Sequence, residues 1–227
     1  MSFPHLARWR GPGLALALLC LGGVALRAQA KPHESASPRW EYLGEKHGVR
    51  IYSKELPGRE LPVFRVEGLV DEPFWKVIRV LQDAARHPDW VPNCAESRVL
   101  SKESFGKYRI YQRFDVPWPV WDRDVVLDVH GLQQGEREVA LVDIRAVESS
   151  QPSLPKRVVR IPRLHSKYRV YGRGPSQTFI SYDVDAHLGG SLPTWLLRWV
   201  VRDLPVDTIQ ALRKQLKRVQ VSAAKPS

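Results

Sequence analysis

Cysteine is scarce in this chain, because its 227 residues contain two, at positions 20 and 94. Cys20 lies in a leading segment that we expect to be removed, which would leave Cys94 without an intramolecular disulfide partner. The stability of the chain must therefore come from a packed core. Hydrophobic residues make up 43% of the sequence, which is enough to build the core of one domain of ordinary size.

Sequence motifs for several common kinds of chemistry are missing as well. The histidines beyond residue 30 do not pair with each other or with cysteine at metal-ligand spacing, so we expect no metal site. The chain has neither a Gly-x-Ser-x-Gly nucleophile elbow nor a glycine-rich phosphate loop between a strand and a helix. These absences favour a protein that is not an enzyme and that uses no cofactor.

A long hydrophobic run is also lacking. The apolar stretch at residues 14–26 has no charge over thirteen residues, whereas a permanent transmembrane helix needs about 20. Arg8 and Arg10 precede this stretch and the small residues Ala28 and Ala30 follow it, which is the layout of a secretory signal peptide. We therefore expect residues 1–30 to be a signal peptide that is cleaved near Ala30, so that the mature protein is periplasmic or secreted.

A mitochondrial presequence and a retained membrane anchor are the alternatives for this leading segment. Its three arginines and its lack of acidic residues are typical of a presequence, but its uninterrupted core of leucine and alanine favours export. Lipid attachment at Cys20 is rejected, because Leu19 occupies a position that requires a small residue.

Acidic residues are outnumbered by basic ones. The formal net charge is +11, and removal of three arginines by cleavage after Ala30 would lower it to +8. Apart from a group near the C-terminus, the basic residues are interleaved with acids, which is typical of a solvated surface rather than of a nucleic-acid site. Attraction to anionic lipid head groups contributes about 1 kcal/mol per basic residue near a membrane. We expect a monomer that contacts a membrane surface transiently and does not bind nucleic acid.

The spacing of apolar residues predicts one domain over residues 40–221, between a flexible leader at 31–39 and a disordered tail at 222–227. Helical spacing predicts a helix that Asp71 caps and that ends near Arg86. Short turns separate the predicted strands, which indicates hairpins and hence an antiparallel sheet. The strands are predicted at residues 49–54, 62–70, 97–102, 108–114, 125–132, 139–147, 158–161, 168–171 and 178–186.

The C-terminal region changes to helical spacing. Pro193 suits a first helical turn, and apolar residues then recur on one side of a helix as far as Val219. Because Pro205 interrupts this pattern, we predict a long helix that is kinked or broken near Pro205. An antiparallel sheet that closes round a single amphipathic helix leaves a concave surface, which either large side chains or a ligand must fill.

Four short strings resemble segments of START (StAR-related lipid transfer) domains and occur in the same order. They are Asp-Trp-Val-Pro-Asn at 89–93, Pro-Val-Trp-Asp-Arg-Asp-Val-Val at 119–126, Val-Val-Arg-Ile at 158–161 and Gly-Gly-Ser-Leu-Pro-Thr-Trp-Leu at 189–196. The chain is therefore identified as a bacterial-type exported member of this helix-grip superfamily. The resemblance implies an α+β helix-grip fold, in which a curved antiparallel sheet wraps round a long C-terminal helix and encloses a hydrophobic cavity.

The resemblance further implies a lipid or sterol-like ligand that is bound beneath the C-terminal helix and transferred without chemical change. Glu96 matches a buried acid of cholesterol-carrying relatives, but Val129 stands where those relatives have the opposing arginine, which argues against a cholesterol-type polar anchor. Glu96 as an exposed acid, and Trp195 and Trp199 as ordinary core contacts, remain alternatives. The residues expected to line the cavity are Glu96, Leu127, Val129, Val142, Ile144, Tyr182, Val184, Trp195, Leu196 and Trp199.

Two other classes of function also remain open. The wider superfamily includes polyketide cyclases and aromatases, and acid–base chemistry of that kind would fall to Glu96, Tyr182 or His187. A partner-binding module with a plugged interior is the other alternative. Trp118 and Trp121 flank Pro119, and they suit either a membrane-facing loop or packing at the edge of a strand.

Overall fold

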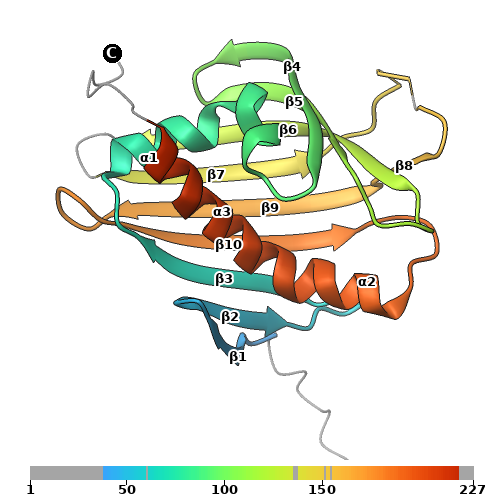
Figure 1. Ribbon diagram of the computed structural model, residues 1–227, viewed down its shortest axis with the longest axis horizontal. Helices are drawn as coiled ribbons and strands as arrows, with labels where there is room; N and C mark the ends of the chain where they lie inside the picture. The colour runs from blue at the N-terminus through green and yellow to red at the C-terminus, as the bar shows by residue number, and fades with distance from the viewer. Residues whose placement is uncertain (1–37, 60, 135–137, 151, 154, 220–227) are drawn as a thin grey trace, which may run out of the picture. The chain divides into compact units, whose positions relative to one another are not determined.

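The computed structural model describes residues 38–59, 61–134, 138–150, 152–153 and 155–219 (Figure 1). The expected signal peptide at 1–30, most of the leader at 31–39 and the tail at 222–227 lie outside these residues. In the described part, one ten-stranded sheet carries the helices on one of its faces (Figure 1). This arrangement confirms the predicted α+β helix-grip fold.

The sheet has the strand order β1-β2-β3-β10-β9-β7-β6-β5-β4, with antiparallel pairing between all neighbours. One short strand, β8, lies off this path and pairs in parallel with the start of β6. The strands are β1 Glu41–Lys46, β2 Val49–Lys54, β3 Val63–Val70, β4 Cys94–Ser104, β5 Lys107–Phe114, β6 Asp122–Gln134, β7 Val139–Ala146, β8 Val158–Arg160, β9 Arg163–Gly172 and β10 Thr178–His187.

The first helix, α1 (Phe74–Gln82), is shorter than predicted. It begins after Pro73, and Asp71 does not cap it, because the Asp71 carboxylate instead accepts a hydrogen bond from Gln177 at 3.0 Å. A 3₁₀ helix at Ala84–Asp89 follows α1 and contains His87 and Pro88.

The C-terminal helix consists of α2 (Thr194–Arg198), a π-helical turn (Trp199–Asp203) and α3 (Leu204–Arg218). Pro205 lacks an N–H group, so it cannot donate the α-helical hydrogen bond to the residue four positions earlier. The predicted break near Pro205 is therefore confirmed, and it takes the form of the π-helical turn.

The core of the domain falls into two clusters. In the first, α1 and α3 pack on β2, β3, β9 and β10, and the apolar side of α3 is at most 1% exposed at Val206, Ile209, Leu212 and Leu216. The second cluster lies on β5 and β6, where it is joined by partly buried residues of β7. The C-terminal helix thus covers one part of the inner face of the sheet more closely than the other.

A buried ion pair joins β8 to β6. Asp124 is fully buried, and its carboxylate accepts two hydrogen bonds from Arg160, at 2.7 and 2.9 Å. Arg160 also donates to the carbonyl oxygens of Ser149 and Pro152. This contact holds the segment before β9 against the sheet.

The substitution Arg160→Leu should lower the free energy of unfolding by about 3 kcal/mol, because it leaves a buried carboxylate without its partner. Urea denaturation measures this loss. The matched control is Arg145→Leu, which removes an arginine that is 61% exposed from its pair with Asp143 and should cost less than about 1 kcal/mol. Equal losses in the two variants would show that the Asp124 pair has no special role.

Candidate functional site

A pocket of about 450 Å³ lies between the inner face of the sheet and the C-terminal helix. Its volume falls in the range of about 300–1,000 Å³ that is usual for ligand sites in proteins. Side chains from α1, the 3₁₀ helix, β5, β6, β7, β9, β10 and the C-terminal helix line it, and most of them are apolar. The pocket contains most of the second core cluster and also reaches residues of the first, such as Ile78 and Trp90.

Alternation along β5 and β6 builds one long wall of the pocket. The inward positions of β5 are Tyr108, Ile110, Gln112 and Phe114, and Ile110 pairs with Leu127 on β6. A strand advances by about 3.3 Å per residue, so the lining on β5 extends over about 20 Å. The pocket is therefore long enough to accommodate an extended apolar group.

The C-terminal helix closes the opposite side of the pocket. Leu196 of α2 is 2% exposed, and Trp199 and Val200 of the π-helical turn also line the pocket. Thr208 of α3 contributes a hydroxyl group, which donates a hydrogen bond to the carbonyl oxygen of Leu204 at 2.8 Å. The π-helical turn thus lies directly over the pocket.

Eight of the ten residues expected to line a cavity do line this pocket, whereas Glu96 and Trp195 do not. Contact of the eight lining residues with a ligand remains a prediction. The eight are Leu127, Val129, Val142, Ile144, Tyr182, Val184, Leu196 and Trp199.

The expectation that Glu96 faces the interior was wrong. Its side chain is 41% exposed, and its carboxylate lies 3.0 Å from Arg98 and 4.0 Å from Arg113. The pairing of β4 with β5 shifts register between Cys94 and Glu96, so simple alternation does not give the direction of the side chain. The alternative, an exposed acid at the start of a strand, describes Glu96 better.

The expectation for Trp195 was also wrong. This residue is 50% exposed at the start of α2, although its neighbour Leu196 is buried against the pocket. Successive residues of a helix differ in direction by about 100°, so Trp195 lies at the flank of the apolar stripe instead of at its centre. The helical spacing identified the stripe but not its edge.

Two tyrosines stack inside the pocket. The rings of Tyr168 and Tyr182 are nearly parallel, with centroids 4.2 Å apart. Burial raises the pKa of Tyr182 above its ordinary value and the pKa of Tyr168 well above it. Both phenols are therefore neutral at physiological pH and act as polar groups without charge.

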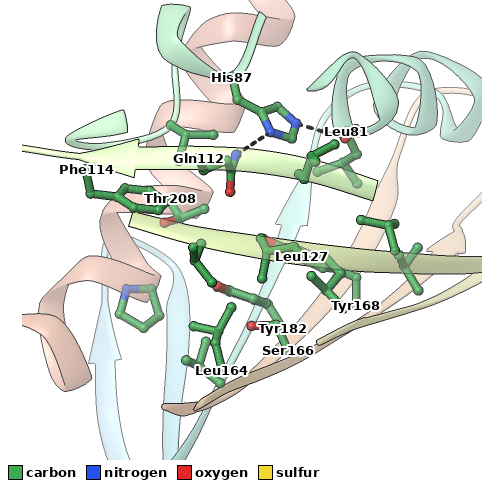
Figure 2. A pocket seen from close by; sticks show the side chains of 18 of the residues that line it. Leu81, His87, Gln112, Phe114, Leu127, Leu164, Ser166, Tyr168, Tyr182 and Thr208 are labelled. Carbon is green, nitrogen blue, oxygen red and sulfur yellow. Dashed lines mark hydrogen bonds between the residues drawn. The ribbon is translucent and has the colours of Figure 1, made fainter. Parts of the chain in front are cut away.

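A hydrogen-bonded pair that the sequence analysis missed, His87 and Gln112, also lines the pocket (Figure 2). Nε2 of His87 lies 3.1 Å from the carbonyl oxygen of Leu81, and Nδ1 lies 2.9 Å from Nε2 of Gln112. The surrounding protein excludes water from the imidazole and so lowers the pKa of His87. The sequence feature that could have revealed this pair is Gln112 itself, because it is a polar residue at an inward position of β5 between the apolar residues Ile110 and Phe114.

Within the described part of the chain, no three side chains of histidine, cysteine, aspartate or glutamate gather to form a metal site. Among the same residues, no helix combines the length and the apolar character needed to cross a membrane.

Comparison with known proteins identifies the fold. A family model described as "START domain" matches residues 24–222. A STAR-related lipid transfer protein from Xanthomonas axonopodis is 30% identical, with a TM-score of 0.70 over 78% of this chain and 98% of that one. Human STARD10 is 20% identical and shares the fold, with a TM-score of 0.70 over 79% of this chain and 73% of its own. An uncharacterised protein from Pseudomonas aeruginosa is 26% identical over 181 residues, which are 79% of this chain and 87% of that protein.

The free energy of unfolding should fall when the pH drops from about 6.5 towards 5, and His87 should cause part of this fall. The pKa of His87 is lower in the folded chain than in the unfolded chain, so within this window the unfolded chain binds more protons. Denaturant titrations at several pH values should therefore give a shallower pH dependence for His87→Gln than for the native protein.

The matched control for this measurement is His130→Gln, which makes the same substitution at an exposed histidine of β6. If the pH dependence is no shallower for His87→Gln than for this control, the fold does not hold the imidazole of His87 in its neutral form.

Proposed function

This chain belongs to the START domain family, and from that premise we propose that it carries a lipid or another hydrophobic molecule in its pocket without changing it chemically. The observation that carries the proposal is the apolar pocket of about 450 Å³, which the side chains of the sheet and the helix leave unfilled. The description of the Xanthomonas axonopodis relative as a lipid transfer protein supports the same function.

An apolar ligand has a similar free energy in the pocket and in a bilayer, so the protein is expected to carry the ligand rather than to store it tightly. Each methylene group that the pocket shields from water contributes about 0.8 kcal/mol, but a bilayer offers the same shielding. Exchange between membrane and pocket is therefore nearly neutral in free energy. The protein lowers the barrier to crossing water, and the direction of transfer comes from a gradient or from other proteins.

The C-terminal helix is the gate in this proposal. Leu196 and Trp199 line the side of the pocket that the helix covers, so movement of this part of the helix would open that side to a ligand. The π-helical turn and Pro205 break the regular hydrogen bonding at this place, and π-helical turns are frequent at functional sites. Bending at the turn would uncover the pocket and leave the packing of α3 in place.

The acid–base groups that line the pocket favour carriage over cyclisation. His87 is one of them, but both of its ring nitrogens already make hydrogen bonds within the protein. Of Glu96, Tyr182 and His187, the pocket lining includes Tyr182 alone. Burial raises the pKa of Tyr182, so its phenol is a poor general base at neutral pH.

We place the contact with the membrane at the loop between β5 and β6. Trp118 is 90% exposed and Trp121 is 56% exposed, and indole rings favour the interface of a bilayer. Arg123 donates hydrogen bonds to the carbonyl oxygens of Trp121 and Gly189, which connects this loop to the turn before α2. The loop and the gate are thus neighbours. The protein would act as an exported monomer, in the periplasm or outside the cell, with no nucleic acid as partner.

Filling the pocket should abolish carriage. We expect Val129→Trp to reduce lipid binding about tenfold or more, because an indole at this inward position of β6 occupies the space that the ligand needs. Native mass spectrometry of the purified protein detects bound lipid, and transfer of a fluorescent lipid between vesicles measures carriage.

The matched control is His130→Trp, which places the same side chain at the next residue of β6, where the native side chain is exposed. Equal lipid binding by the two variants would contradict the assignment of the pocket. Turnover of a poly-ketone by native protein that retains no lipid would favour a cyclase instead.

Removal of the exposed indole should weaken membrane contact. Trp118→Ala is expected to reduce the binding to anionic vesicles and the rate of lipid transfer severalfold, while lipid already in the pocket stays bound. Vesicle co-sedimentation measures the first effect. Leu141→Ala is the control, because Leu141 is 45% exposed on β7 beside the pocket-lining Ala140 and Val142, and points to the other face of the sheet. A loss of equal size in the control would remove the case for this loop.

A further inference from the structure

Gln112 is a polar residue in an apolar wall. Gln112 is 6% exposed and lies between the inward-facing residues Ile110 and Phe114 of β5. It pairs with Val125 on the neighbouring strand, β6. Burial of an amide without hydrogen bonds costs free energy, so both of its polar atoms need partners. The fold provides a hydrogen-bond partner for only one of these two atoms.

The amide nitrogen of Gln112 is the atom that the fold satisfies. It donates to Nδ1 of His87 at 2.9 Å and lies 3.4 Å from Oγ of Ser97 on β4. The amide oxygen has no hydrogen-bond partner among the residues that the structure describes. Figure 2 shows this oxygen directed into the space that the labelled side chains surround.

A chain of hydrogen bonds fixes which way the amide of Gln112 points. The carbonyl oxygen of Leu81 can only accept, so the hydrogen of the neutral His87 ring is on Nε2. Nδ1 of His87 is then an acceptor and requires the amide nitrogen of Gln112 opposite it. A rotated amide would place two acceptors face to face. The pocket is therefore presented with an oxygen, which accepts hydrogen bonds and cannot donate them.

The hydroxyl groups of the pocket have no such one-sided preference. The hydroxyls of Ser166, Tyr168 and Tyr182 can each donate or accept, so they serve ligands of either kind. The hydroxyl of Thr208 already donates to a backbone carbonyl. The amide oxygen of Gln112 has a fixed direction and can only accept a hydrogen bond. It therefore distinguishes a ligand that donates a hydrogen bond from a ligand that can only accept one.

We propose that Gln112 makes the pocket selective for hydrophobic molecules that carry a hydroxyl group, over ethers and esters of the same shape. The ligand hydroxyl donates to Oε1 of Gln112, and His87 is a positioning residue that holds the amide in this orientation. The inference rests on the proposed function, because it requires a hydrophobic ligand in the pocket.

The test compares 1-hexadecanol with its methyl ether, which has the same chain but no hydrogen to donate. An equimolar mixture is offered to the protein, and native mass spectrometry gives the ratio of the two complexes. The native protein should favour the alcohol. Gln112→Met, which has a similar shape and only a weak acceptor, should shift the ratio about tenfold towards the ether.

Two further variants separate selection by Gln112 from general effects. Thr178→Val removes a hydroxyl of β10 that already donates to the carbonyl oxygen of Glu72 and does not line the pocket, so it should keep the native ratio. His87→Phe removes the acceptor that orients the amide, so it should lower the preference for the alcohol even if Gln112→Met fails to fold. If native protein and both Gln112→Met and His87→Phe give the same ratio, the role of Gln112 is overturned while carriage stands. If the native protein binds neither compound, the proposed function itself fails.

Discussion

The C-terminal helix is too narrow to cover the whole inner face of the broad curved sheet, and the rest of the structure depends on this difference in size. The apolar side of α3 is fully used on β2, β3, β9 and β10, where it meets α1 and leaves almost no exposed surface. Much of the inner face of β5, β6 and β7 instead faces the pocket, with Leu127, Val129 and Val142. In an ordinary core such side chains would pack against one another. Here they line a space, so the same residues that stabilise the fold also form the walls of the pocket.

A domain with an unfilled interior needs other contacts to keep its walls in place. Polar links across the strands supply them. Asp183 on β10 binds Arg65 of β3 at 2.7 and 2.9 Å and Arg169 of β9 at 3.1 Å, so that three adjacent strands share one carboxylate. Asp124 and Arg160 fix β8 to β6 in the same manner. These arginine–carboxylate contacts link neighbouring strands and so help to hold them in register around the pocket.

The sequence predicts this fold well, because alternation and helical spacing report which face of each element is buried. β2 has the predicted bounds and the break before Pro205 was expected, whereas β1 was missed because its residues are almost all exposed and show no alternation. Prediction of the pocket lining failed at Glu96, where a shift of strand register reverses the direction of a side chain. It also overlooked Gln112, whose role depends on a histidine 25 residues away in the chain. Periodicity encodes burial, but it does not encode register shifts or hydrogen bonds between distant segments.

The energetics of carriage explain why a single polar group matters in such a pocket. The apolar wall offers a lipid about the same environment as a bilayer, so it provides affinity for any molecule of suitable length and little discrimination among them. A buried group that accepts one hydrogen bond penalises every ligand that leaves it unpaired, and such penalties discriminate more strongly than small differences in apolar area. Selectivity in this fold therefore depends on the few polar atoms whose orientation the protein fixes. The hydrogen bonds from Gln112 through His87 to the backbone at Leu81 provide that fixed orientation on β5, beneath the helix that closes the pocket.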